Sequence, residues 1–202
     1  MNFIFIILIF LISAVIARIL IPRILLISLR KKLFDIPDDR KVHKRAIPRL
    51  GGVSFFPTTL FAFCLVYTFR LLGGDSVSTL YASYLLPELL LFACGMTLLY
   101  LTGIADDLVG VRYRQKFVIQ IFCACLFPLS GLWINDLYGL FGIHELSVYV
   151  GIPFTILTVV FITNAINLID GIDGLASGLS SVALLIFTFL FIEKGLWSYA
   201  ML

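Results

Sequence analysis

The stretch NAINLIDGIDGLASG, residues 164–178, places two amides and two carboxylates directly behind an apolar run. These four polar side chains recur at intervals of three residues: Asn164, Asn167, Asp170 and Asp173. That spacing makes a slowly winding stripe on an α-helix and an eclipsed one in a 3₁₀ turn, so the side chains can converge on one ligand. A polar hairpin between two membrane helices is the structural alternative, but it would not require Asn167 at the end of an apolar run. We therefore interpret the stripe as part of a binding site.

A second cluster consists of two adjacent carboxylates, Asp106 and Asp107, which close another apolar run. Adjacent residues of a helix diverge by about 100°, so the two carboxylates cannot serve one ligand equally. We expect one to approach a metal ion or a phosphate while the other fixes a lysine, such as Lys116. Taken alone, the pair is explained more simply as the solvated end of a helix.

The third candidate segment, FDIPDDRKVHKRAIPRLGG at residues 34–52, is basic and rich in turn-forming residues. Its lysines and arginines can cradle the phosphates of a nucleotide, and the pair Gly51-Gly52 permits close backbone approach. Attraction to anionic lipids explains the charge equally well, but the prolines and the glycine pair specify a shaped loop. His43 has no second His or Cys nearby in the sequence. We therefore interpret it as a loop-positioning or phosphate-contacting residue in preference to a metal ligand.

Composition places these segments in a membrane protein. The 202 residues are 61% hydrophobic and 13% charged, with a mean hydropathy of +1.08. The apolar residues come in blocks of about 20, the length that a helix needs to cross a bilayer. Six blocks run over residues 3–28, 53–72, 85–104, 117–134, 150–167 and 175–192. The sequence therefore predicts an all-α integral membrane protein with about six transmembrane helices.

The basic residues predict how these helices are oriented. Eleven of the 15 Lys and Arg lie in segments 30–49 and 112–116, whereas the loops 73–84 and 135–149 contain none. The positive-inside rule therefore puts the N-terminus outside and all three polar segments in the cytoplasm. Turn signals and alternating apolar residues near 133–150 are compatible with a small extracytoplasmic β-hairpin.

Together, the three segments resemble the polyprenyl-phosphate N-acetylhexosamine-1-phosphate transferase superfamily. The matching stretches, in order, are DIP at 35–37 with RKVH at 40–43 and PRLGG at 48–52, DDLVG at 106–110 through Lys116, and NAINLIDGIDGL at 164–175. PRLGG is closer to the branch that uses UDP-N-acetylglucosamine or a related UDP-N-acetylhexosamine than to the MurNAc-pentapeptide branch, whose loop more often reads Pro-Thr-Met-Gly-Gly.

The resemblance implies an enzyme that transfers N-acetylhexosamine 1-phosphate, GlcNAc 1-phosphate in the first instance, from a UDP-sugar to undecaprenyl phosphate. UMP is released, Mg²⁺ is required with Mn²⁺ as the alternative ion, and the step opens a cell-envelope glycan pathway such as cell-wall or lipopolysaccharide biosynthesis. The implied partners are UDP-N-acetylhexosamine, undecaprenyl phosphate, the lipid bilayer and a second copy in a homodimer, without nucleic acid. The implied location is the bacterial inner (plasma) membrane, with the active face in the cytoplasm.

The resemblance also implies roles for individual residues. Asn167 would be a magnesium ligand, Asp106 would contact or deprotonate the lipid phosphate, and Asp107 would support the metal ion or a lysine. A phosphate monoester has a second pKa of about 6 and is mostly dianionic at neutral pH. Asp106 as an orienting group or as a nucleophile therefore stays open beside Asp106 as a base. The implied substrate-binding residues are Lys44, Arg49, His43, Lys116, Asp170 and Asp173.

Members of the superfamily usually have ten or eleven membrane helices, and their later half carries further metal-binding motifs. We therefore expect residues 1–202 to form a single polytopic membrane domain, the first half of such a transferase, and to be weak or inactive alone. A non-catalytic membrane scaffold and a transporter subunit are the alternatives. A transporter should place broken helices and polar groups near the midplane, whereas here the polar clusters follow the ends of the blocks.

Overall fold

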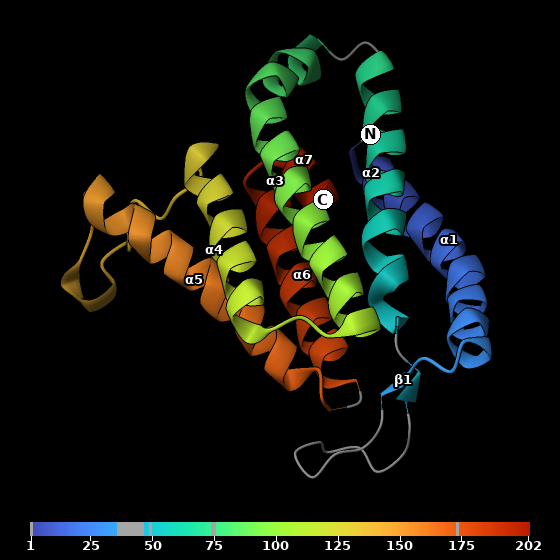
Figure 1. Ribbon diagram of the computed structural model, residues 1–202. Coiled ribbons are helices and arrows are strands. Elements are labelled where there is room, and N and C mark those ends of the chain that lie inside the picture. The colour runs from blue at the N-terminus through green and yellow to red at the C-terminus, as the bar shows by residue number, and fades with distance from the viewer. Residues whose placement is uncertain (1, 36–46, 49, 74–75, 173) are drawn as a thin grey trace. The chain divides into compact units, whose positions relative to one another are not determined.

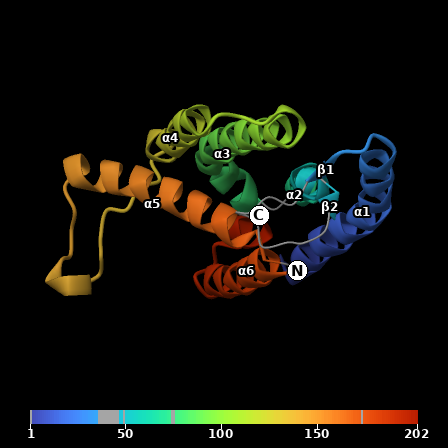
Figure 2. The same ribbon diagram turned by 60° about the horizontal axis from the view of Figure 1, so that its bottom comes forward.

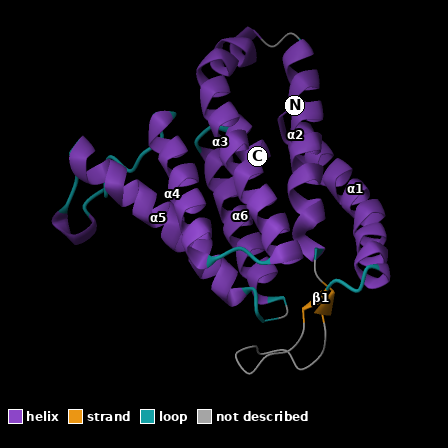
Figure 3. Ribbon diagram, in the orientation of Figure 1, coloured by secondary structure: helices purple, strands orange, loops and turns teal. Residues whose placement is uncertain are grey.

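The computed structural model describes residues 2–35, 47–48, 50–73, 76–172 and 174–202, and nearly all of this part of the chain is helical (Figures 1 and 3). The helices are α1 (Asn2–Arg30), α2 (Phe55–Leu72), α3 (Ser76–Val109), α4 (Tyr113–Leu129), α5 (Val148–Ile169), α6 (Leu175–Glu193) and α7 (Trp197–Met201), with the 3₁₀ turns η1 (Gly51–Ser54) and η2 (Leu140–Gly142). Two short strands, β1 (Phe34–Asp35) and β2 (Ile47–Pro48), pair in antiparallel register. The predicted all-α membrane architecture is confirmed.

Five helical segments in the described part of the chain are long and apolar enough to cross a membrane. They are Asn2–Arg30, Gly51–Leu72, Leu85–Val109, Val148–Ile169 and Leu175–Glu193. In the most apolar stretch of 18 residues in each segment, only 6–28% of the residues are buried within the protein. Most of the apolar side chains are therefore free to face lipid. The remaining predicted block, 117–134, corresponds to α4, whose 17 residues reach the lower limit of length for a crossing.

The chain divides into two compact units, residues 1–79 with 169–202, and residues 80–168. The first unit contains α1, α2, α6 and α7, and the second contains α4, nearly all of α5 and most of α3. The single polytopic domain expected from the sequence stays a prediction.

In the first unit, α1 and α2 lie side by side (Figures 1 and 2) and α7 contacts α1. Small residues serve this packing, since Ser28 on α1 and Ala62 on α2 are both 0% exposed. The Ser28 hydroxyl donates to the carbonyl oxygen of Leu33 at 2.8 Å and so fixes the turn after α1. At the other end of α1, the Phe3 ring packs edge-on against Trp197 with 5.1 Å between ring centroids. Helix α7 is thereby anchored to the start of α1.

Arg70 is the one charged side chain that is buried among the described residues, with 9% of its surface exposed. Its Nη1 donates to Ser198 Oγ at 3.4 Å and to Met201 Sδ at 3.6 Å. A thioether is a weak acceptor, and the Nε of Arg70 meets no acceptor in the described chain. The end of α2 is therefore tied to α7 by a buried cation whose hydrogen bonds are few and long.

In the second unit, α3 and α4 approach closely where small residues meet. The Cys123 thiol donates to the carbonyl oxygen of Gly95 at 3.4 Å, and a Cβ added to Gly95 would lie 3.4 Å from the Leu126 side chain. One turn further along, Phe92 and Phe127 pack edge-on with 6.3 Å between ring centroids. Small residues at a crossing let membrane helices approach closely, which accounts for this pairing.

The segment between α4 and α5 folds back on itself around η2. Asp136 and Glu145 form an isolated antiparallel bridge, and the amide of Leu146 donates to the carbonyl oxygen of Asn135 at 2.8 Å. The hairpin predicted near 133–150 is therefore present, although its strand pairing is limited to one bridge. The side of the membrane on which it lies stays a prediction.

The base of this hairpin is fixed against the first turns of α5. The amide of Ile134 donates to Thr155 Oγ1 at 2.8 Å, and the same hydroxyl donates to the carbonyl oxygen of Gly151 at 2.7 Å. A Cβ at Gly151 would lie 2.5 Å from the Trp133 ring, a distance that side chains do not tolerate. Glycine is therefore required here for close packing of the hairpin on the helix.

Candidate active site

The turn between α3 and α4 brings the Asp106-Asp107 pair next to the start of α4. Helix α3 ends at Val109 because Gly110 adopts a left-handed conformation with φ of 73°, and its amide donates to the carbonyl oxygen of Asp106 at 2.9 Å. Left-handed glycines commonly end helices in this way, since they carry no Cβ. Only residues 110–112 separate the two helices, so the ends of both helices lie next to each other.

Asp106 binds both the turn and the next helix. One of its carboxylate oxygens accepts a hydrogen bond from Lys116 Nζ at 2.6 Å, and the other accepts one from the amide of Val111 at 2.9 Å. The Lys116 and Asp106 side chains are 35% and 33% exposed, so solvent screens the ion pair and it adds only about 0–1 kcal/mol of stability. The pair therefore adds little to stability and leaves an ammonium group and a carboxylate partly exposed where the two helices meet.

Helix α5 is tied to α4 by a pair of amide side chains. Asn164 Nδ2 donates to Gln120 Oε1 at 2.8 Å and to the carbonyl oxygen of Val160, one turn earlier on its own helix, at 2.8 Å. This contact places the last turns of α5 beside the first turns of α4. Asn167 lies one turn nearer the end of α5 and is exposed. The second unit therefore gathers Asp106, Lys116 and Asn167 at one end.

The predicted site residues fall into three groups according to where the structure places them. It joins Lys116 to Asp106, with Asp107 half-buried beside them, and brings Asn167 to the same end of the unit. The resemblance implied that Asp107 supports a metal ion or a lysine, and the lysine contact falls on its neighbour Asp106. Asp170 is exposed, directly follows α5 and belongs to the first unit. The remaining predicted residues lie outside the described residues: His43, Lys44, Arg49 and Asp173.

Sequence reasoning does not single out Gln120, although the structure places it between the two helices that carry the site. The signal is present in the sequence, because Gln120 is the only amide in the run FVIQIFCACLF at 117–127. Polar side chains within membrane segments are costly and often functional. Asn164, the first member of the polar stripe, faces Gln120, whereas Asn167 is exposed at the end of the helix.

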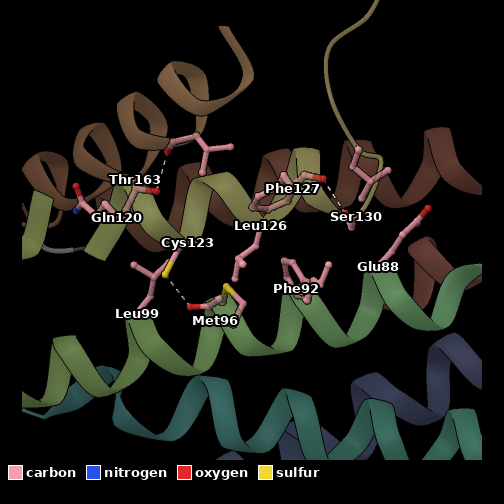
Figure 4. A pocket seen from close by; sticks show the side chains of 14 residues that line it. Glu88, Phe92, Met96, Leu99, Gln120, Cys123, Leu126, Phe127, Ser130 and Thr163 are labelled. Carbon is pink, nitrogen blue, oxygen red and sulfur yellow. Dashed lines mark hydrogen bonds between the residues drawn. The ribbon is translucent and has the colours of Figure 1, made fainter. Parts of the chain in front are cut away.

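A narrow cavity of about 30 Å³ runs between α3, α4 and α5, with Gln120 at one end and Glu88 at the other (Figure 4). Apolar side chains such as Phe92, Leu99 and Leu126 form most of its wall. The volume suffices for one or two water molecules and is far too small for a sugar nucleotide. The candidate site is therefore the open end of the helices near Asp106, and the cavity lies behind it.

The donor atoms at this end suit a magnesium ion. Asp106 and Asp107 offer carboxylate oxygens and Asn167 an amide oxygen, the ligand type that Mg²⁺ prefers. In the described ranges, no three His, Cys, Asp or Glu side chains are grouped closely enough to hold a metal ion by themselves. Mg²⁺ is usually held by one or two carboxylates together with substrate phosphates, and water completes its shell. These residues therefore fit an ion bound jointly with a phosphate.

Fold and site together define a multi-pass membrane protein whose polar side chains gather where its helices end. The family described as glycosyl transferase family 4 matches residues 89–202, which is more than half of the chain, and the chain belongs to this family.

Several relatives carry names from polyprenyl-linked sugar transfer. The chain is 31% identical over 176 residues to a probable undecaprenyl-phosphate N-acetylglucosaminyl 1-phosphate transferase of Bacillus subtilis, covering 87% of this chain and 45% of that protein. It is 29% identical over 198 residues to the phospho-N-acetylmuramoyl-pentapeptide-transferase of Staphylococcus carnosus, covering 91% and 58%. An undecaprenyl-phosphate alpha-N-acetylglucosaminyl 1-phosphate transferase of Yersinia pestis is 30% identical over 183 residues, covering 87% and 46%. The resemblance is confirmed, and the chain spans about half the length of the curated relatives it matches.

Proposed function

We propose that the protein transfers N-acetylhexosamine 1-phosphate from a UDP-sugar to undecaprenyl phosphate and releases UMP. The observation that carries this proposal is the Lys116–Asp106 pair, 2.6 Å apart where α3 and α4 meet. An ammonium group at the end of membrane helices suits a lipid-borne phosphate, whose tail stays in the bilayer while its head group lies at the interface. The family match and the names of the relatives support the same chemistry.

In the proposed step, an oxygen of the lipid phosphate attacks the phosphorus that carries the sugar. A new P–O bond forms, the bond from that phosphorus to the oxygen shared with UMP breaks, and UMP leaves with this oxygen and its electron pair. The lipid phosphate has a second pKa of about 6 and is mostly dianionic at neutral pH, so no proton needs to be removed. Asp106 is then required to orient Lys116 and the incoming phosphate, in preference to acting as a base or as a nucleophile.

The protein has to bring two anions together and hold them in line. Lys116 would neutralise part of the phosphoryl charge, and the bond to Asp106 would hold its ammonium group in place. Mg²⁺, or Mn²⁺ in its place, would be held by Asn167 and Asp107 together with the phosphates and would supply further charge neutralisation. Positioning and electrostatic stabilisation supply most of the catalysis in phosphoryl transfer, and these groups are of the types that provide both.

UDP-N-acetylglucosamine is the proposed sugar donor. The segment PRLGG at 48–52 and the names of the Bacillus and Yersinia relatives favour it. The Staphylococcus relative is named for a phospho-N-acetylmuramoyl-pentapeptide substrate, which makes the corresponding UDP-activated compound the competing donor.

The proposed location is the bacterial inner membrane, with the active end in the cytoplasm. The support is the distribution of Lys and Arg, which concentrate in segments 30–49 and 112–116. The proposed orientation would give the site access to a water-soluble UDP-sugar in the cytoplasm. A homodimer, implied by the family resemblance, belongs to the same proposal.

The test is release of UMP by membranes that contain the protein, supplied with UDP-N-acetylglucosamine, undecaprenyl phosphate and Mg²⁺. Because the chain spans about half of its relatives, the assay includes a version joined to the unmatched part of the Bacillus relative. We expect UMP release that depends on the lipid phosphate and falls by about 100-fold or more in Asp106→Asn.

The matched control is Asp136→Asn, the same chemical change in the hairpin between α4 and α5. There the carboxylate accepts a hydrogen bond from the amide of Tyr138 at 2.6 Å, and an asparagine oxygen can replace it. Equal rates of UMP release by Asp106→Asn and Asp136→Asn would reject the proposed function. So would the absence of lipid-dependent UMP release both from the chain alone and from the version joined to part of the Bacillus relative.

A further inference from the structure

The amide pair Gln120–Asn164 has a fixed polarity, and the carbonyl oxygen of Val160 sets it. A backbone carbonyl can only accept, so the Asn164 atom 2.8 Å from it must be the NH₂ group. The same nitrogen lies 2.8 Å from Gln120, so the Gln120 atom that it meets must be the amide oxygen. The NH₂ group of Gln120 therefore points away from Asn164. The Val160 carbonyl oxygen thus orients the Asn164 amide, and the Asn164 amide orients that of Gln120.

The two N–H groups of Gln120 meet no protein acceptor within the part of the chain that the structure describes. The side chain is half-buried, and Figure 4 shows its amide at the end of the cavity opposite Glu88, the direction in which α3 runs on to Asp106. Lys116 is four residues earlier on α4, so the two side chains occupy neighbouring positions on one face of that helix. An oriented pair of donors thus belongs to the helix position one turn after Lys116, whose ammonium group is part of the candidate site.

We propose that Gln120 is a further binding residue, which donates to a phosphoryl oxygen of the substrate held by Lys116, and that Asn164 is the positioning residue for its amide. The inference rests on the proposed function for the identity of the ligand. Its chemistry is an anionic phosphate oxygen, which the lipid phosphate or the diphosphate of the UDP-sugar can supply. A neutral donor on a charged acceptor strengthens binding by about 10- to 100-fold.

Gln120→Glu separates this role from a purely structural one. Glutamate has the same shape and still offers an oxygen to Asn164, so the link between α4 and α5 is kept. It loses both donors and presents a negative charge to the phosphate. We expect the KM for one phosphate substrate to rise by about tenfold or more, with kcat and the temperature of thermal unfolding much less affected.

The matched control is Gln115→Glu, the same change on an exposed side chain in the first turn of α4. It alters the net charge of the protein equally and should leave both KM values within about twofold, because exposed charges are screened by salt. Asn164→Asp is the second variant. It cannot donate to the Gln120 oxygen, so the Gln120 amide turns round and donates to the new carboxylate. The same KM should then rise although Gln120 is intact.

Equilibrium binding of UDP-N-acetylglucosamine and of farnesyl phosphate to the purified protein identifies the source of the phosphate. Weaker binding of either probe by Gln120→Glu, with binding of uncharged farnesol unchanged, supports the inference and names the substrate. Unchanged binding of both probes, or equal losses in Gln120→Glu and Gln115→Glu, overturns it. If the protein releases no UMP but Gln120→Glu still weakens farnesyl phosphate binding, the transfer function fails while the binding role stands.

Discussion

The ammonium group of Lys116 and the carboxylate of Asp106 lie 2.6 Å apart across the turn that joins α3 to α4. The second carboxylate oxygen accepts the amide of Val111, so the backbone of the turn fixes the position of the pair. In the proposed function, this fixed lysine is the group that meets the lipid phosphate. Its partner is the first aspartate of the pair and not the second.

Replacing the lysine should abolish most activity without unfolding the protein. For Lys116→Met we expect UMP release to fall by about 100-fold or more, since a charge-stabilising donor is lost from the proposed site. The free energy of unfolding should change by only about 0–1 kcal/mol, because the ion pair is one-third exposed. The control is Lys194→Met at the exposed end of α6, which should retain full activity. A Lys116→Met protein as active as this control would remove Lys116 from the site.

The backbone of the α3–α4 turn should be sensitive at Gly110. Its φ is 73° and the space around it is open, so an added side chain meets backbone strain and no steric clash. Gly110→Ala should cost about 1–2 kcal/mol of stability or shift the turn, and either effect would disturb Asp106. Gly110→Asn should be milder, because asparagine tolerates the left-handed region better. The measured resistance to thermal inactivation and the rate of UMP release should both decrease in the order wild type, Gly110→Asn, Gly110→Ala. A Gly110→Ala protein as stable and as active as wild type would contradict this prediction.

Two glycine-to-alanine changes should have opposite effects on stability. At Gly151 the new Cβ would lie 2.5 Å from the Trp133 ring and 2.6 Å from the Ile134 carbonyl oxygen, so we expect a loss of about 1–3 kcal/mol. At Gly178 on α6 nothing lies within 4 Å, and alanine should stabilise the helix by about 0.4–1 kcal/mol. Thermal unfolding in detergent measures both. Equal shifts would mean that the hairpin base is not packed as described.

The buried cation of α2 should be replaceable by an uncharged side chain. Arg70 has 9% exposure, two long hydrogen bonds and an Nε without an acceptor in the described chain, so burying it costs more than its contacts return. We expect Arg70→Met to raise the free energy of unfolding by about 1–3 kcal/mol. Arg70→Lys keeps the charge with fewer donors and should not stabilise. Destabilisation by Arg70→Met in thermal unfolding would indicate an acceptor that binds this guanidinium in the membrane.

The proposed orientation can be tested with single cysteines introduced into a background without the four native ones. His43→Cys, Asp107→Cys and Asp170→Cys should react with a membrane-impermeant maleimide only from the cytoplasmic side. Tyr138→Cys, at a hairpin residue that is 88% exposed, should react only from the opposite side. Labelling of Asp107→Cys from the outer side would reject the proposed orientation of the site, and labelling of residues 43 or 170 from that side would contradict the topology that the sequence predicts.

The sequence predicts the helices well because their apolar blocks are long and need little context. Ends of helices are less predictable: the block 85–104 stops short of Val109, since polar residues continue α3 until Gly110 provides a left-handed turn. The block 117–134 begins four residues after the start of α4 and runs past its end, because Tyr113, the basic residues that follow it and Ser130 carry no hydropathy signal for either boundary.

The candidate site is predictable in its residue types and less so in its contacts. Asp106, Asp107, Lys116 and Asn167 are all indicated by their spacing, and the structure gathers them at one end of the second unit. The choice of Asp106 as the lysine partner depends on the direction of each side chain at a helix end, which spacing does not determine. Gln120 is not predicted from the sequence because it is a single amide in an apolar run, with no other polar residue at helical spacing in that run. Its partner Asn164 is 44 residues away.

The three-residue connection between α3 and α4 also bears on how the family can vary in length. One residue inserted at the start of α4 would turn Lys116 by about 100° around the helix and away from Asp106, so natural insertions should be excluded there. Beyond its base at Trp133 and Ile134, the longer segment between α4 and α5 pairs mainly with itself and carries none of the proposed chemistry. Relatives can lengthen, shorten or decorate that segment while the ammonium-carboxylate register at the other end stays intact.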